Sequence, residues 1–141
     1  MSDELGNIRV LLVKHVIEGH DRGVKFVLGK LRDEGFETIY SLYRLPKEIV
    51  TQAQQEDVDV IGVTTSSRVY QIHIPELVKC LEENNMKNDV FLLVGGLVGG
   101  EDEKNLLGMG VDAVYGPGKE LGTLPSLIYE FKKTKLKSIS S

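Results

Sequence analysis

The sequence has no tryptophan, a single cysteine and no apolar run long enough to span a bilayer. The one thiol, Cys80, cannot form an internal disulfide, which excludes a disulfide-stabilised scaffold. The amino-terminal residues 1–6 have neither a basic segment nor an apolar core, so we do not expect a secretion signal. These absences predict a cytoplasmic protein that does not associate with membranes.

The sequence also has no large excess of charge of either sign: 17 basic and 21 acidic residues give a net charge of −4 at pH 7. A balance of this kind creates no field that would gather nucleic acid, so we expect no nucleic-acid partner. The length of 141 residues suits one domain with one core. We therefore expect a single domain over residues 1–141, with its core at about 7–133 and a frayed tail at 134–141.

Five segments are apolar without the alternation of a half-exposed strand, which is typical of parallel strands covered on both faces. They are residues 8–13, 38–40, 58–63, 90–94 and 113–115.

Helical patterns separate these segments. Residues 21–34 have apolar side chains at spacings of three and four, and Gly35 follows where a helix C-cap is expected. Pro46 and Pro75 each favour the first turn of a helix, and predict the starts of the next two. The last two helices are expected at about 101–107 and 121–133.

The alternation of strands and helices predicts an α/β fold: a flavodoxin-like (Rossmann-like), doubly wound, five-stranded parallel sheet in the order 2-1-3-4-5. Ligands of such sheets bind outside the carboxyl ends of the strands, where the strand order switches. The loops expected at that edge are residues 15–23, 64–73, 95–100 and 116–118.

The first of these loops contains Glu18-Gly19-His20-Asp21-Arg22-Gly23. The His20 imidazole can bind a metal through one ring nitrogen while a carboxylate orients the other, and Glu18 is close enough in sequence to be that carboxylate. From spacing alone, it is equally open that His20 and Asp21 cap the following helix.

The next two loops have hydroxyls and glycines. Thr64-Thr65-Ser66-Ser67 follows the third strand, and Gly95-Gly96-Leu97-Val98-Gly99-Gly100 follows the fourth. Glycine allows a bulky ligand to approach the backbone closely, but this run is neither a dinucleotide fingerprint nor a Walker loop. Simple turns explain both loops equally well, as they do Gly116-Pro117-Gly118.

Taken together, these loops resemble the cobalamin-binding domain of the acyl-CoA mutase family, in particular the small or C-terminal domain of methylmalonyl-CoA mutase. That family has D-x-H-x-x-G after strand one, S-x-L after strand three and G-G after strand four. The matching stretches here are Glu18 to Gly23, Thr64-Thr65-Ser66 and Gly95-Gly96. The likeness spans roughly residues 7–130, and GHDRG at residues 19–23 is more specific to the acyl-CoA mutase branch than the general histidine motif.

The resemblance implies that His20 is the lower axial ligand of cobalt in adenosylcobalamin, after displacing the dimethylbenzimidazole base. The freed nucleotide tail would then insert between strand one and the loops after strands three and four. Homolysis of the cobalt–carbon bond would start a radical rearrangement, so this chain needs no catalytic residue of its own. The implied cofactor-binding residues are Glu18, Gly19, His20, Asp21, Arg22, Gly23, Thr64, Ser66, Gly95, Gly96 and Gly116.

Three positions depart from the family pattern. Glu18 replaces aspartate, Thr64 replaces serine and Ser66 replaces leucine. Glutamate is one methylene longer and can orient His20 only if the loop shifts, whereas threonine keeps the hydroxyl. These departures leave open a degenerate relative that serves as a regulatory or scaffold domain.

Nothing in the chain resembles a substrate site, and its length leaves no room for the barrel that would bind an acyl-CoA. The resemblance therefore implies an isomerase subunit that works in a hetero-oligomer with a large catalytic mutase subunit.

Methylmalonyl-CoA is the leading substrate, although isobutyryl-CoA and hydroxyisobutyryl-CoA mutases use similar small subunits. A corrinoid carrier for methyl transfer is the alternative. Such carriers usually have a helical cap domain ahead of the cobalamin domain, whereas the first strand is expected here by Ile8, which argues against this alternative. A phosphorylated receiver domain is excluded because no aspartate lies at residues 64–67.

Overall fold

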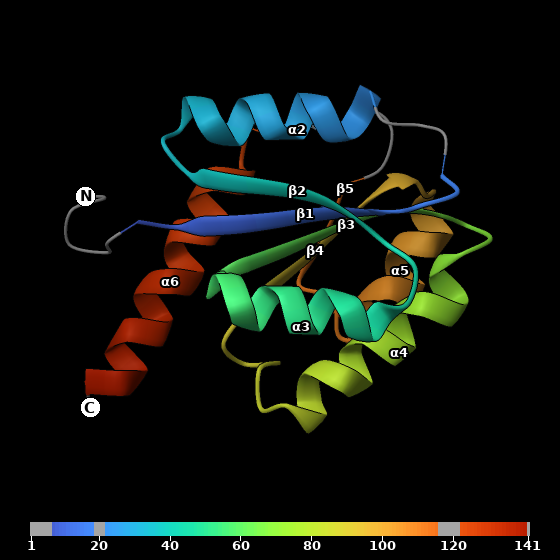
Figure 1. Ribbon diagram of the computed structural model, residues 1–141. Coiled ribbons are helices and arrows are strands. Elements are labelled where there is room, and N and C mark those ends of the chain that lie inside the picture. Colours follow the sequence, from blue (N-terminus) through green and yellow to red (C-terminus); the bar gives the residue numbers. More distant parts are fainter. Residues whose placement is uncertain (1–6, 19–21, 116–121, 141) are drawn as a thin grey trace.

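The computed structural model describes residues 7–18, 22–115 and 122–140. Within them, five parallel strands form one sheet in the order β2-β1-β3-β4-β5, which confirms the predicted fold (Figure 1). The strands are β1 (Arg9–His15), β2 (Glu37–Tyr43), β3 (Val60–Ser66), β4 (Phe91–Leu97) and β5 (Ala113–Tyr115). The helices are α2 (Arg22–Asp33), α3 (Pro46–Glu56), α4 (Tyr70–Glu83), α5 (Gly100–Gly108) and α6 (Leu124–Ser140).

The sheet is covered on both faces, as its apolar strands require. One core lies between the sheet and α2 and α6, where Val24, Leu28 and Ile128 pack against Leu12 and Leu93. The other core lies on the side of α3, α4 and α5 (Figure 1). The two faces are therefore distinct, and alternation along a strand decides which face each side chain joins.

The ends of two helices confirm the sequence predictions. Gly35 has a φ of +89°, and the amide of Phe36 donates to the Leu31 carbonyl, which closes α2 with the predicted glycine C-cap. Helix α3 begins at Pro46.

The predicted start of the third helix at Pro75 is wrong, because α4 begins at Tyr70 and contains Pro75. Tyr70 and Ile74 are both completely buried, and this packing holds the first turn as helix. Proline removes one hydrogen bond, but its carbonyl partner would be that of Gln71, which lies at an exposed position in the same turn.

Strands β1, β2, β3 and β4 extend two or three residues beyond the predicted carboxyl ends. Residues 64–66 and 95–96, expected in loops, are paired in the sheet, with Thr64 opposite Gly95 and Thr65 opposite Gly96. The apolar pattern stops earlier than the backbone pairing, because the last residues of a parallel strand need only hydrogen-bonding neighbours.

The expected frayed tail also differs from the structure, since α6 continues to Ser140. Lys135 in this helix donates to the Asp89 carbonyl at 2.9 Å, which holds the segment against the loop before β4. None of the helices within the described ranges is both long and apolar enough to cross a membrane.

Candidate functional site at the carboxyl edge of the sheet

One row of residues crosses the sheet near its carboxyl edge. Lys14 in β1 lies opposite Thr64 in β3, Thr64 lies opposite Gly95 in β4, and Gly95 lies opposite Tyr115 in β5. Residues in register on parallel strands point to the same face, which here is the face covered by α2 and α6. Lys14 is only 7% exposed and Thr64 is half-buried, so the row places a cation and a hydroxyl beside a glycine without a side chain.

The four consecutive hydroxyls after Val63 do not share one face. Thr64 and Ser66 point to the side of Lys14, whereas Thr65 points to the opposite core, where its buried hydroxyl oxygen has no hydrogen-bond partner among the described residues. The Ser67 hydroxyl donates to Asp102. The alternation of β3 therefore brings together the two hydroxyls, Thr64 and Ser66, that the sequence analysis assigned to the cofactor.

Gly95 and Gly96 are required by the sheet itself. Gly96 has a φ of +117°, and a Cβ there would overlap the carbonyl oxygen of Thr65. A Cβ at Gly95 would lie 2.9 Å from the carbonyl oxygen of Tyr115. Close approach of neighbouring strands thus accounts for both glycines without a ligand, and a role for Gly95 in cofactor binding is a separate proposal.

The start of α2 is open. Gly23, its second residue, is exposed, and a Cβ at this position would have no atom within 4 Å. On the other side of the same loop, the amide of Glu18 donates to the His15 carbonyl and forms a turn at the end of β1. Of the other predicted site residues, Arg22 opens α2, whereas Gly19, His20, Asp21 and Gly116 lie outside the described residues.

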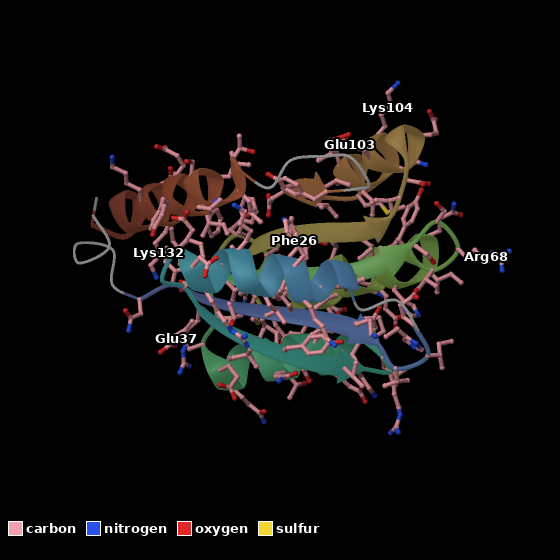
Figure 2. All side chains as sticks on the ribbon, turned by 90° about the horizontal axis from the view of Figure 1, so that it is seen from above. Phe26, Glu37, Arg68, Glu103, Lys104 and Lys132 are labelled. Atoms are coloured by element: carbon pink, nitrogen blue, oxygen red, sulfur yellow. The ribbon has the colours of Figure 1, made fainter. Side chains whose placement is uncertain are left out.

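Because His20 is outside them, the structure does not test the predicted metal ligand. Within residues 7–18, 22–115 and 122–140, no group of three or more histidine, cysteine, aspartate or glutamate side chains could hold a metal ion. Arg68, in the turn after β3, extends outward from the carboxyl edge (Figure 2).

A carboxylate that the sequence analysis did not assign to the site lies at the same edge. Asp102, the third residue of α5, accepts hydrogen bonds from the Ser67 hydroxyl, the Tyr70 hydroxyl and the Gly99 amide. These donors hold the pKa of Asp102 below its usual range, with the Ser67 bond contributing most. Its position three residues after the N-cap was the available signal, but the sequence could not reveal donors from another loop.

Three aromatic side chains form a second unpredicted cluster where β1 and β2 end. The rings of His15 and His73 are 5.1 Å apart, and the Tyr43 hydroxyl lies 2.8 Å from Nδ1 of His73. Burial raises the pKa of Tyr43 to about 12, so its hydroxyl stays protonated beside His73. Burial, followed by the charge of His15, lowers the pKa of His73.

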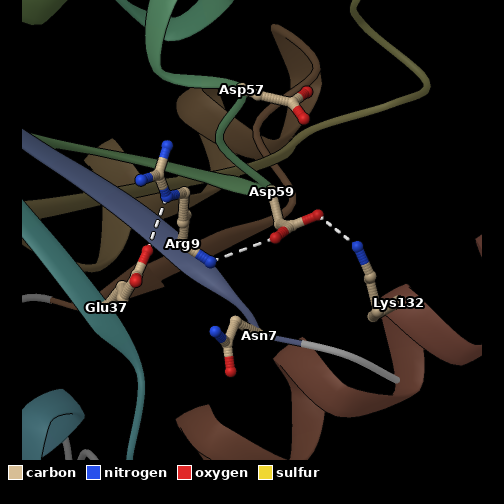
Figure 3. A pocket seen from close by; sticks show the side chains of 6 residues that line it. All are labelled: Asn7, Arg9, Glu37, Asp57, Asp59 and Lys132. Atoms are coloured by element: carbon tan, nitrogen blue, oxygen red, sulfur yellow. Dashed lines mark hydrogen bonds and ion pairs between the residues drawn. The ribbon is translucent and has the colours of Figure 1, made fainter. Parts of the chain in front are cut away.

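The opposite, amino edge of the sheet has a polar hollow of about 320 Å³ (Figure 3). Asp59 accepts from Lys132 of α6 at 2.6 Å and from the backbone amide of Arg9 at 3.0 Å, and the Arg9 side chain pairs with Glu37. These bonds connect α6 to the sheet, so the charged groups at this edge have a structural role. Figure 2 also shows Lys132 and Glu37 at the end of the molecule opposite Arg68.

Comparison with known proteins identifies the family. The model of the B12 binding domain matches residues 8–124. The chain belongs to the B12-binding domain family. This B12-binding domain is 45% identical over 108 residues to the 2-hydroxyisobutanoyl-CoA mutase small subunit of Aquincola tertiaricarbonis, covering 76% of this chain and 79% of that protein.

Two further relatives differ in size. The pivalyl-CoA mutase small subunit of Xanthobacter autotrophicus is 37% identical over 112 residues, covering 79% of this chain and 74% of that protein. Methylmalonyl-CoA mutase of Escherichia coli is 35% identical over 119 residues, which cover 84% of this chain but only 16% of that enzyme. The B12-binding domain therefore matches two small subunits over most of their length and the larger mutase over one part.

Solved structures confirm the fold. A cobalamin-binding protein from Desulfitobacterium hafniense has a TM-score of 0.67 at 20% identity, covering 77% of this chain and 52% of that one. A putative response regulator from Chloroflexus aurantiacus has a TM-score of 0.69 at 14% identity, covering 91% and 99%. Because B12-binding domains share this fold with response regulators, the fold alone does not indicate function.

Proposed function

We propose that this chain is the cobalamin-binding small subunit of an adenosylcobalamin-dependent acyl-CoA mutase, an isomerase, in the cytoplasm. The observation that carries the proposal is the 45% identity to a mutase small subunit over 79% of its length. The motif stretch Glu18 to Gly23 and the row of Lys14, Thr64 and Gly95 support the proposal.

The residues present are compatible with cobalamin. The missing side chain at Gly23 leaves room for the flat corrin beside the start of α2. Thr64 offers a hydroxyl on the α2 and α6 side, where the adjacent Gly95 has no side chain to block a nucleotide tail. His20 is the proposed lower axial ligand and Glu18 the carboxylate that orients it. When bound, adenosylcobalamin supplies a cobalt–carbon bond whose homolysis starts radical chemistry.

The remaining proposed site residues have supporting roles. Ser66 adds a hydroxyl beside Thr64, and Gly96 allows the close approach of β3 and β4. Gly19, Asp21, Arg22 and Gly116 are further proposed cofactor-binding residues, by their place in the family motifs.

The acyl-CoA site belongs to a large partner subunit, and the two chains form a hetero-oligomer. Substrate choice then depends on the partner. 2-Hydroxyisobutanoyl-CoA is the first substrate to test, because the relative at 45% identity is named for it, and methylmalonyl-CoA and pivalyl-CoA follow.

The test is the absorption spectrum of purified protein after incubation with hydroxocobalamin or adenosylcobalamin and removal of the free corrinoid. We expect retained cobalamin with a changed spectrum in the wild type, and loss of that change in His20→Ala. His73→Gln is the matched control, since it alters a histidine at the same edge but on the other face of the sheet. If the wild type retains no corrinoid, even with a large mutase subunit present, the proposal fails and a scaffold role is favoured.

A further inference from the structure

Asp102 connects two loops that begin at neighbouring strands. Its Oδ2 atom accepts from the Ser67 hydroxyl at 2.6 Å and from the Gly99 amide at 2.8 Å, and its Oδ1 atom accepts from the Tyr70 hydroxyl at 2.8 Å. Ser67 and Tyr70 follow the end of β3, whereas Gly99 follows the end of β4. Both carboxylate oxygens are therefore engaged, and they join the two loops directly.

The Tyr70 end of this connection is rigid. Tyr70 is fully buried, and its hydroxyl also accepts a hydrogen bond at 3.1 Å from Nδ2 of Asn105, one turn further along α5. A buried phenol held by two residues of α5 cannot move without breaking both bonds. The start of α4 and the start of α5 are thus fixed relative to each other.

The position of this connection relates it to the cofactor site. The ladder between β3 and β4 ends with Thr64 opposite Gly95, Thr65 opposite Gly96 and Ser66 opposite Leu97. The bonds of Asp102 lie immediately beyond the last of these pairs. A carboxylate at this place keeps the strand ends that carry Thr64 and Gly95 from separating where their ladder stops.

We propose that Asp102 is a positioning residue of the cobalamin cleft, which holds the carboxyl ends of β3 and β4 at the spacing that the cofactor requires. This inference rests on the proposed function for the identity of the ligand. It requires no contact between Asp102 and the cofactor. Outer residues that orient metal ligands change metal affinity by about 10–100-fold when removed, and we take the lower end of that range for Asp102.

The chain offers a matched control at the other end of the same strand. Asp112 accepts a hydrogen bond at 2.8 Å from the amide of Leu92, at the amino end of β4. Asp102→Ala and Asp112→Ala therefore each remove one carboxylate that holds β4, at opposite ends. A general loss of stability would affect both variants, whereas a positioning role would affect cofactor binding in only one.

Two measurements test the inference. The first is the Kd for hydroxocobalamin, read from the absorption change, together with the Tm of each cofactor-free variant. We expect Asp102→Ala to weaken binding about 10-fold, Asp102→Asn to recover part of the loss, and Asp112→Ala to bind like the wild type. Equal affinity in Asp102→Ala and wild type, or equal losses in both alanine variants, would overturn it.

The second measurement needs no cofactor. Amide hydrogen exchange should accelerate at residues 64–66 and 95–97 in Asp102→Ala, and near Leu92 in Asp112→Ala. Unchanged exchange at the carboxyl ends would overturn the positioning role. A wild type that does not bind cobalamin, with accelerated exchange in Asp102→Ala, would instead reject the proposed ligand and retain Asp102 as the residue that holds the strand ends.

Discussion

The Tyr43 hydroxyl is hydrogen-bonded to Nδ1 of His73 at 2.8 Å, and this bond joins the edge strand β2 to helix α4. The His15 ring lies 5.1 Å from that of His73, with its Nε2 atom 3.2 Å from the Arg44 carbonyl and its Nδ1 atom accepting from the Ile17 amide. Because burial lowers the pKa of His73, this imidazole favours its neutral form.

The stability of the protein should therefore fall in mild acid through His73. Its pKa is lowered in the folded state by burial and by His15, while the unfolded value stays near about 6.5. The unfolded chain then binds the proton more readily, so the contribution of His73 is complete above about pH 6.5 and is lost as the pH falls towards the lower folded pKa. The Tm of wild type and His73→Gln, measured between about pH 7.5 and about pH 5.5, should fall further in the wild type. An equal fall in both would contradict this assignment.

Removal of the Lys132 charge should destabilise the protein without affecting cobalamin. The side chains of Lys132 and Asp59 are 17% and 9% exposed, and hydrogen bonds to charged groups in such places contribute about 1.5–3 kcal/mol. Lys132→Met should lower the free energy of unfolding in urea by this amount and leave the Kd for hydroxocobalamin unchanged, because the pair lies at the amino edge. Lys133→Met, at an exposed neighbour, is the control and should change neither quantity.

An alanine at Gly96 should damage the sheet. The φ of +117° and the overlap of a Cβ with the Thr65 carbonyl both oppose any side chain, and a strained residue of this kind costs about 1–3 kcal/mol. Urea unfolding of Gly96→Ala measures the loss directly. A variant as stable as the wild type would show that β3 and β4 can separate at no cost, contrary to their close approach.

An alanine at Gly23 should have opposite effects on stability and on binding. No atom lies within 4 Å of a Cβ at Gly23 or at Gly29, both in α2, so each alanine should stabilise the helix by about 0.5–1 kcal/mol. Under the proposed function, only Gly23→Ala adds a methyl beside the corrin. Such overpacking costs about 1–3 kcal/mol, which is about a 30-fold loss of affinity at the middle of that range. Equal cobalamin affinity in the two variants would place the corrin elsewhere.

Much of the fold could be predicted because its signals are local. Unbroken apolar runs such as residues 58–63 predict strands covered on both faces, and Gly35 and Pro46 mark helix ends through their own backbone preferences. The carboxyl ends of the strands were harder to predict, because Thr64 and Gly95 are not part of the apolar pattern although they continue the β-ladder. The start of α4 was predicted wrongly at Pro75, because the burial of Tyr70 outweighs the usual preference of proline for the first turn of a helix.

The sequence by itself determined the strand order, the edge at which a ligand would bind and the family, because these follow from hydrophobic pattern, right-handed crossovers and contiguous motifs. Only the tertiary structure decided which side chains meet at that edge. Asp102 is hydrogen-bonded to Ser67, which is 35 residues away in the sequence, and Tyr43 to His73, which is 30 residues away. Strand pairing and helix packing bring these residues together, and no local pattern encodes either. The tertiary structure likewise decided that Thr64 and Thr65 point to opposite faces, because the side chains of a strand alternate and the register selects which of them joins the core.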